Sequence, residues 1–212
     1  MESIDKMIQA LLGTDYADER VAEAMRKADR KLFVPPNYAP NAYEDRPLPI
    51  GFGQTISAPG VVAFMSKNLE VREGMKVLEI GAGSGWQAAI LGILVGTKGE
   101  VWSVERVPGL VAMAKERIVR LGVGNVHVVE GDGTLGYPGQ APFDRIMVTA
   151  AGPKIPEPLL AQLKESGKLM MPVGNSFVQE LVLAEKRNGA VDTNFMLSVV
   201  FVPLIGKHGY RE

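Results

Sequence analysis

The chain has 212 residues, no cysteine, two histidines and a formal net charge of −1. The missing cysteines exclude disulfides, thiolate metal sites and a cysteine nucleophile, and the near-zero charge argues against nucleic acids and anionic membranes as partners. The longest apolar run, Ala88 to Val95, falls far short of the about 20 residues that span a bilayer. We therefore expect a cytoplasmic, monomeric protein that binds no metal and has one domain.

The N-terminal part divides at about residue 33. Residues 1–33 carry apolar side chains at helical spacing, such as Ile4, Ile8 and Leu11, and predict two helices. Five prolines between Phe33 and Gly53 exclude a long helix or a central strand there. A loop of this length in a compact chain is usually functional or disordered, so we expect its residues 37–52 to fold over a bound cofactor. The alternative is a static surface loop. Residues 1–57 are thus the predicted covering part, and 58–212 the core.

From residue 59 onward, predicted helices and strands alternate. The helices are expected at 61–69, 86–95, 108–121 and 155–164, and the strands at 75–81, 100–105, 126–132, 143–151, 167–174, 179–187 and 195–204. This alternation predicts a parallel sheet with helices on both faces. The segment RNGAVDTN is too short for a crossover helix, so the last two strands form an antiparallel hairpin. The expected fold is α/β: a Rossmann-like, doubly wound, mostly parallel seven-stranded sheet with an antiparallel C-terminal hairpin and a small helical N-terminal extension.

A glycine-rich turn follows the first strand of this core. Gly81, Gly83, Ser84 and Gly85 lie between that strand and a helix, where glycines permit a tight turn and let a ligand approach the backbone beside the positive helix end. Glu105 ends the next strand, where its carboxylate can accept both hydroxyls of a ribose. The alternative for Glu105 is a surface acid at a strand end. The pattern predicts a nucleoside-containing cofactor.

Three features favour S-adenosylmethionine over a nicotinamide dinucleotide. The sixth position of the glycine motif is Trp86, where a dinucleotide fold prefers glycine. Glu79 lies two residues before Gly81, and a carboxylate there attracts an ammonium or sulfonium but repels a pyrophosphate. Asp132 and Gly133 follow the third strand, where the carboxylate can accept from the adenine amino group. A plain Asp-Gly turn is the alternative.

These residues together resemble the protein-L-isoaspartate O-methyltransferase family. The similarity runs from about Phe33 to Gly206 and rests on the stretches GQTISAPG, VLEIGAGSG, EGDGTLGYPGQAPFDRIMVTAA, KLMMPVG and FVPLIG. Two departures are Gly60, where the family usually has His or Tyr, and Ser166-Gly167, where it commonly has two glycines. The resemblance implies methyl transfer from S-adenosylmethionine to the free carboxylate of L-isoaspartyl residues in damaged proteins and peptides.

The hydroxyls of GQTIS fit that chemistry. A carboxylate with a pKa near 4 is already ionised at neutral pH, so it needs orientation more than a general base. Thr55 and Ser57 alternate along an extended segment, which places both hydroxyls on one side, and we predict that they donate to the substrate carboxylate. The resemblance points to Ser57 as the active residue. The alternative is that Ser57 caps the helix beginning near Pro59.

Other interpretations remain open. The segment FVPLIG is a candidate for reading the substrate backbone, because Pro203 interrupts ladder donation; an ordinary strand with an edge proline is the alternative. The same fold also serves methyltransferases that act on small molecules or RNA. Two further classes are a nicotinamide-dependent oxidoreductase and a non-catalytic module that binds the adenosyl group.

Overall fold

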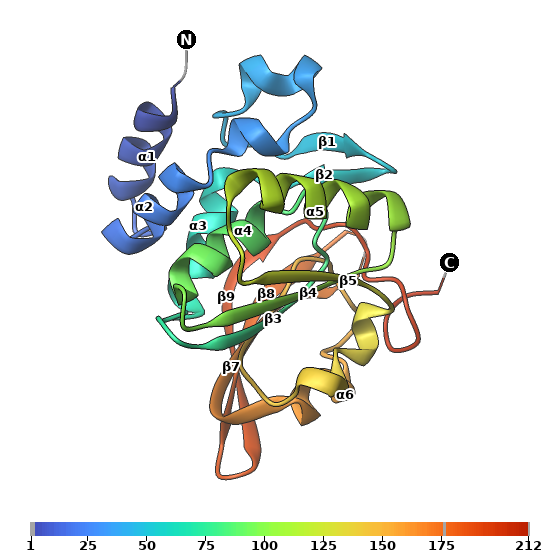
Figure 1. Ribbon diagram of the computed structural model, residues 1–212. Coiled ribbons are helices and arrows are strands. Elements are labelled where there is room, and N and C mark those ends of the chain that lie inside the picture. The colour runs from blue at the N-terminus through green and yellow to red at the C-terminus, as the bar shows by residue number, and fades with distance from the viewer. Residues whose placement is uncertain (1–2, 176, 212) are drawn as a thin grey trace.

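The computed structural model describes residues 3–175 and 177–211 and contains the expected sheet (Figure 1). Seven strands lie in the order β5-β4-β3-β6-β7-β8-β9, parallel from β5 to β7 and antiparallel at β8 and β9. The predicted fold class is confirmed. The strands are β3 (Lys76–Ile80), β4 (Glu100–Glu105), β5 (Val126–Glu130), β6 (Phe143–Val148), β7 (Leu163–Gly174), β8 (Gln179–Arg187) and β9 (Ala190–Val199).

Helices cover both faces of the sheet unequally. Helices α1 to α5 lie on one face, and α6 lies on the other with two short 3₁₀ helices (Figure 1). The α-helices are α1 (Ile4–Leu12), α2 (Glu19–Lys27), α3 (Pro59–Asn68), α4 (Trp86–Val95), α5 (Pro108–Leu121) and α6 (Glu157–Ala161). The 3₁₀ helices are η1 (Arg30–Phe33), η2 (Pro36–Asn41), η3 (Gly133–Leu135) and η4 (Pro138–Gln140). Within the described ranges, no helix has the length and apolarity that crossing a bilayer requires.

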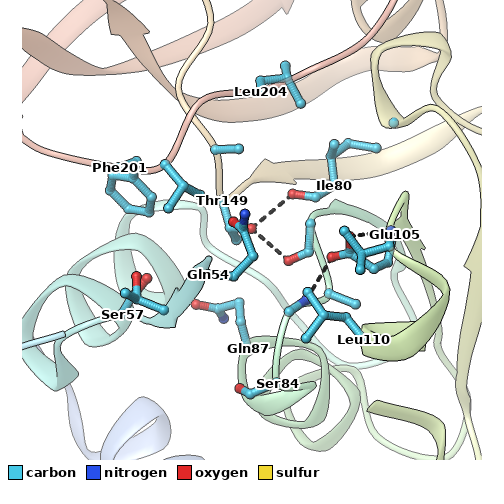
Figure 2. Close-up of a pocket in the computed structure, with 18 of the residues that line it drawn as sticks. Gln54, Ser57, Ile80, Ser84, Gln87, Glu105, Leu110, Thr149, Phe201 and Leu204 are labelled. Atoms are coloured by element: carbon cyan, nitrogen blue, oxygen red, sulfur yellow. Dashed lines mark hydrogen bonds between the residues drawn. The ribbon is translucent and has the colours of Figure 1, made fainter. Parts of the chain in front are cut away.

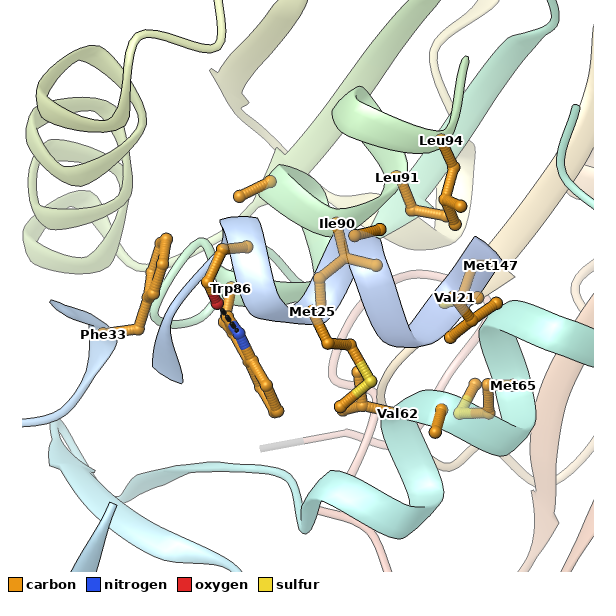
Figure 3. Packing of buried hydrophobic residues seen from close by; sticks show 14 of the residues in the cluster. Val21, Met25, Phe33, Val62, Met65, Trp86, Ile90, Leu91, Leu94 and Met147 are labelled. Carbon is orange, nitrogen blue, oxygen red and sulfur yellow. Dashed lines mark hydrogen bonds between the residues drawn. The ribbon is translucent and has the colours of Figure 1, made fainter. Parts of the chain in front are cut away.

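The larger core joins the N-terminal helices to the sheet. Figure 3 shows Met25 of α2, Val62 of α3 and Ile90 of α4 packed together, all of them at most 3% exposed. Trp86 begins α4 inside this core and donates its indole N–H to the carbonyl of Ala28 over 2.7 Å. Because α4 is apolar nearly all round, it needs this second layer of helices over its outer face.

The proline-rich segment contains a small hairpin that the sequence reading missed. Strands β1 (Leu48–Gly51) and β2 (Gln54–Ile56) form a two-stranded antiparallel sheet. Pro49 is tolerated because each strand has a free edge. The hairpin tip carries Phe52, whose ring lies so close to Gly109 of α5 that a Cβ on that glycine would come within 2.3 Å of it. The hairpin is thereby seated against the start of α5.

A buried arginine holds this segment in place. Arg30 is 0% exposed, and its guanidinium donates to the carbonyls of Ala42, Arg46 and Ser57 over 2.8, 2.9 and 3.0 Å. Burial lowers the pKa of Arg30 to about 10, so the group stays charged at neutral pH. The rigid fork of the guanidinium therefore ties the loop at 42–46 to the GQTIS segment.

Several boundaries near the C-terminus differ from the prediction. The helix expected at 155–164 ends at Ala161, because the chain enters β7 at Leu163. Strand β9 begins at Ala190, five residues early, since Asn188 and Gly189 make a two-residue turn with φ of 52° and 77°. Strand β9 also ends at Val199, so residues 200–204, which were expected to belong to this strand, lie beyond it.

Candidate active site

A pocket opens at the carboxyl ends of β3 and β4, beside the end of β6. In Figure 2, Ser57 and Glu105 lie on opposite sides of it, and Phe201 and Leu204 approach from the C-terminal segment. This edge of a parallel sheet is where open α/β folds bind ligands. The structure brings these predicted site residues together in the pocket lining: Thr55, Ser57, Gly81, Gly83, Ser84, Glu105 and Gly133.

Two glycines of the site have no room for a side chain. Gly81 has a φ of +96°, and a Cβ there would lie 2.4 Å from the hydroxyl oxygen of Thr149. A Cβ on Gly133 would lie 2.3 Å from the side chain of Ile80. Gly85 has a φ of +86° and precedes α4, but it does not line the pocket. Its positive φ shapes the turn, and its predicted contact with a cofactor stays a prediction.

Glu105 both shapes the turn and faces the pocket. Its two carboxylate oxygens accept hydrogen bonds from the backbone N–H groups of Gly83, over 3.0 Å, and Val107, over 2.9 Å. The residue is 7% exposed. Each carboxylate oxygen can accept more than one hydrogen bond. The carboxylate is therefore held in a fixed orientation with capacity left for the two hydroxyls of a ribose.

The hydroxyls of Thr55 and Ser57 are both unengaged. Thr55 is exposed and Ser57 is half-buried, and within the described residues neither hydroxyl makes a hydrogen bond. The alternative that Ser57 caps α3 is wrong: the N-cap is Ala58, which makes no side-chain cap. Asp45 caps the helix instead, because its carboxylate accepts from the backbone N–H of Gly60 over 2.7 Å. The two hydroxyls are therefore available to a ligand.

The same contact explains why glycine is accommodated at position 60. A Cβ on Gly60 would lie 2.8 Å from a carboxylate oxygen of Asp45 and 3.2 Å from the ring of Tyr16. A histidine or tyrosine there would have to displace the Asp45 loop. The departure at position 60 thus goes together with the cap that Asp45 provides.

Glu79 is buried and does not line the pocket. Its side chain is 0% exposed, one carboxyl oxygen accepts from the hydroxyl of Ser103, and the other has no partner. Burial raises the pKa of Glu79 to about 8, and the charge of Glu105 adds to the shift. The predicted attraction of Glu79 for an ammonium or sulfonium group stays a prediction, because no path from the pocket to its carboxyl is shown.

The pKa of Glu79 predicts a pH dependence of stability. The ordinary pKa of a glutamate is 4.5, so between about pH 4.5 and 8 the folded state keeps a proton that the unfolded state has lost. The free energy of unfolding should therefore fall as pH rises through that window. Glu79→Gln should remove this component, because its amide stays neutral. Thermal unfolding of both proteins across the window measures it, and equal pH slopes would contradict the assignment.

A family model described as protein-L-isoaspartate(D-aspartate) O-methyltransferase matches residues 2–209. The chain belongs to this family. A protein-L-isoaspartate O-methyltransferase of Methanothrix thermoacetophila is 51% identical over 208 residues, covering 98% of this chain and 97% of the relative. These matches confirm the resemblance that the glycine turn and GQTIS motif indicated.

Solved structures agree with the assignment. A protein-L-isoaspartate O-methyltransferase structure superimposes with a TM-score of 0.91 at 33% identity, covering 98% of this chain and 67% of that one. A structure from Plasmodium falciparum, described as a protein-L-isoaspartate O-methyltransferase in complex with S-adenosyl-L-homocysteine, has a TM-score of 0.87 at 27% identity. It covers 97% of this chain and 99% of that chain. The similarity therefore extends over the N-terminal helices as well as the sheet.

In this member of the protein-L-isoaspartate O-methyltransferase family, Asp132 is engaged away from the pocket. One carboxylate oxygen accepts from the backbone N–H and the hydroxyl of Thr134, and the other accepts from the N–H of Lys207 over 2.8 Å. These hydrogen bonds lower the pKa of Asp132 despite the opposing effect of burial. Asp132 does not line the pocket, so its predicted contact with adenine stays untested. Asp132 therefore acts as a clamp, because it holds the C-terminal segment at 201–207 through the backbone N–H of Lys207.

That segment supplies one wall of the pocket. Residues 201–205 line it, and the Val202 carbonyl accepts from the N–H of Ala151 over 2.8 Å. The side-chain amide of Gln179 both donates to and accepts from the backbone of Phe201, over 3.1 and 2.6 Å. Pro203 has no N–H, and its carbonyl has no hydrogen-bond partner among the described residues. The segment is thus held by both flanks, and the Pro203 carbonyl stays available to a ligand.

Releasing the clamp should affect the substrate more than the cofactor. Asp132→Ala removes the acceptors for Thr134 and Lys207, so the segment at 201–207 loses its anchor. We expect KM for an isoaspartyl peptide to rise about tenfold, as the loss of one hydrogen bond to a charged group allows, with a smaller effect on S-adenosylhomocysteine affinity. Peptide kinetics and calorimetry measure the two. A larger loss of S-adenosylhomocysteine affinity would instead support the contact with adenine.

Some residues that line the pocket escaped the sequence reading. Thr149 follows β6 and donates its hydroxyl to the carbonyls of Ile80 and Gly81, over 3.0 and 2.7 Å. Gln54 lies next to Thr55 in the GQTIS motif. The signal for Thr149 was its position at the carboxyl end of a strand adjacent to β3, where parallel strands end together. Among the described residues, no three His, Asp or Glu side chains are grouped to hold a metal ion.

Proposed function

We propose that this protein transfers a methyl group from S-adenosylmethionine to the free carboxylate of L-isoaspartyl residues in damaged proteins and peptides, which starts their repair through a succinimide. The observation that carries the proposal is one pocket with two unengaged hydroxyls, of Thr55 and Ser57, facing a glycine turn and Glu105. Family membership supports the substrate, and the relative in complex with S-adenosyl-L-homocysteine supports the methyl donor.

The residues of the pocket fit such a donor. Glu105 offers two oriented oxygens to a ribose, and Gly81 and Gly83 line the pocket with backbone that carries no side chain, so a ligand can approach it closely. Gly133 and Ser84 also line the pocket. When bound, S-adenosylmethionine supplies an electrophilic methyl group. We assign the holding of this donor to these residues.

Orientation of the acceptor is the task of the hydroxyls. The substrate carboxylate is ionised at neutral pH and needs no general base. Thr55 and Ser57 donate to it and hold one oxygen toward the donor, an effect that can contribute on the order of 7–11 kcal/mol when complete. Neutral donors suit this role, because a cation would stabilise the carboxylate before attack and blunt it. Arg30 contacts the carbonyl of Ser57, which keeps the hydroxyl-bearing segment in place.

Selectivity for isoaspartate requires reading the substrate backbone. Isoaspartate differs from aspartate by one methylene moved into the main chain, and an apolar pocket distinguishes one methylene only about 10–200-fold. Stronger rejection needs polar groups that the wrong isomer leaves unpaired. The free carbonyl of Pro203 in the pocket wall is a group of this kind. We therefore assign backbone recognition to residues 201–205.

The proposal also concerns the working form of the enzyme. We take it to act as a monomer in the cytoplasm, as a single domain in which residues 1–57 cover the substrate and cofactor side of the core at 58–212. The contact of Phe52 with Gly109 beside the pocket supports the covering role. The formal charge of −1 argues against nucleic acid as the acceptor. Analytical ultracentrifugation with and without S-adenosylhomocysteine tests the monomer.

The test of the function uses two peptides that differ at one residue, L-isoaspartate or L-aspartate. Each is incubated with the protein and S-adenosylmethionine, and methyl esters are counted. Methylation of the isoaspartyl peptide alone is the expected result. Cofactor binding without methylation of either peptide would retain the donor site and reject isoaspartate as the acceptor. In that case a small-molecule or RNA acceptor for the same fold becomes the alternative.

A further inference from the structure

The chain carries one Asn-Gly pair, at Asn188 and Gly189. The two residues form the tight turn between β8 and β9, both are exposed, and their φ values are 52° and 77°. Figure 1 shows this hairpin projecting from the body of the molecule, at the opposite end from β1 and β2. The pair suits the turn because both positions need a positive φ.

An asparagine before glycine is also chemically vulnerable. The backbone nitrogen of Gly189 can attack the Cγ of Asn188, which forms a C–N bond and expels the side-chain nitrogen as ammonia. Water then opens the resulting succinimide at one of its two carbonyls and gives aspartate or isoaspartate. The only co-reactant is water. The nucleophilic nitrogen must lose its proton, and it must also be free to turn toward Cγ.

Glu165 of β7 holds the nitrogen that would have to react. Its carboxylate accepts from the backbone N–H of Asn188, and it also accepts from the N–H of Gly189 over 3.2 Å. The β7–β8 register, extended past Lys168 and Glu185, places Glu165 opposite Asn188. Glu165 is exposed and makes no ion pair among the described residues, so its charge acts on the turn.

A carboxylate in this position opposes the reaction in two ways. Its negative charge stabilises the Gly189 N–H and repels the negative charge that deprotonation would place on the nitrogen. The hydrogen bonds also hold the turn in one conformation, so they oppose the backbone rotation that would bring the nitrogen of Gly189 to the Cγ of Asn188. A carboxylate is too weak a base to take the amide proton itself.

We propose that Asn188 is a site at which this protein itself deamidates, and that Glu165 slows the damage by holding the N–H of Gly189. The contact is local to the hairpin, since the pocket lies at the carboxyl ends of the parallel strands and the turn lies beside the beginning of β7. The proposal therefore does not depend on the methyltransferase reaction.

The test is ageing of the folded protein at neutral pH, well below its unfolding temperature, followed by mass spectrometry of the peptide that spans the turn. Glu165→Gln keeps the size of the side chain but removes the charge, and it should deamidate roughly threefold faster or more, because a charge-assisted hydrogen bond is about twice as strong as a neutral one. Glu73→Gln changes an exposed glutamate in the turn before β3, two strands away from β7, and is the matched control that should age like the parent.

A second measurement needs no variant. A synthetic peptide of residues 185–191 lacks Glu165 and should deamidate several-fold faster than the same residues in the folded parent. Equal rates for peptide and protein would overturn the proposal, and so would a Glu165→Gln variant that ages at the parental rate. A slower Glu165→Gln variant would show instead that Glu165 assists the attack as a base.

Discussion

Replacing Ser57 with alanine lowers kcat/KM for an isoaspartyl peptide by about a hundredfold, the loss that misplacement of a reacting group by about 1 Å can produce. The reason is that the hydroxyl of Ser57 makes no hydrogen bond within the described part of the chain and lines the pocket. It also does not cap α3, so its removal should leave the helix intact. Steady-state kinetics at saturating S-adenosylmethionine measures the effect.

Three comparisons separate orientation from other causes. Ser198→Ala changes an exposed serine on β9 and should leave kcat/KM unchanged. Thr55→Val should reduce kcat/KM by about tenfold, since it removes one hydrogen bond to the substrate carboxylate and leaves Ser57 in place. Affinity for S-adenosylhomocysteine should be unaltered by Ser57→Ala. An unchanged kcat/KM in Ser57→Ala would reject the assignment of the hydroxyl to the substrate carboxylate.

Replacing Glu105 with alanine weakens the binding of S-adenosylhomocysteine by about a hundredfold. Hydrogen bonds to a charged group contribute about 1.5–3 kcal/mol, and the upper part of that range corresponds to this factor. The carboxylate orients the N–H groups of Gly83 and Val107 as well as facing the pocket, so the variant should also unfold at a lower temperature. Isothermal titration calorimetry and thermal unfolding measure the two effects.

The matched control for Glu105 is Glu73→Ala, which removes a carboxylate that is 68% exposed and forms only a long contact, 3.9 Å, with Lys98. It should bind S-adenosylhomocysteine like the parent. Glu105→Gln adds a further distinction, because it keeps one acceptor and should lose less affinity than alanine. If Glu105→Ala unfolds earlier but binds S-adenosylhomocysteine with full affinity, the residue only shapes the turn and its role toward a ribose is rejected.

The regular part of the fold was predictable because local signals coincide with its boundaries. Helix α4, strand β4 and helix α5 begin and end at the predicted residues. Glycines and prolines stand at these boundaries, where they end one element or start the next. The hairpin of β1 and β2 gave no comparable signal, because four-residue and three-residue strands among prolines show no clear alternation. Its formation depends on contacts such as those of Arg30 with distant carbonyls.

The carboxylates illustrate where sequence reasoning stops. Glu79 lies inside β3, Glu105 ends β4 and Asp132 follows β5, and the sequence predicted that each would face a cofactor. The structure places only Glu105 in the pocket lining. Glu79 is buried beside Ser103 of the neighbouring strand, and Asp132 accepts from Lys207, which is 75 positions away in the chain. Which donor reaches a carboxylate depends on segments that come together only when the chain folds.

The sequence by itself determined the fold class, the glycine turn, the family and the pair of hydroxyls at Thr55 and Ser57, because each of these is written in neighbouring residues or in local spacing. Only the tertiary structure decided that the hydroxyls are free, since Asp45 caps α3 in place of Ser57. It also decided that residues 201–205 form a pocket wall. The physical reason is that hydrogen-bond satisfaction is a property of the whole molecule: a polar group is available to a ligand only when no distant segment has already paired with it.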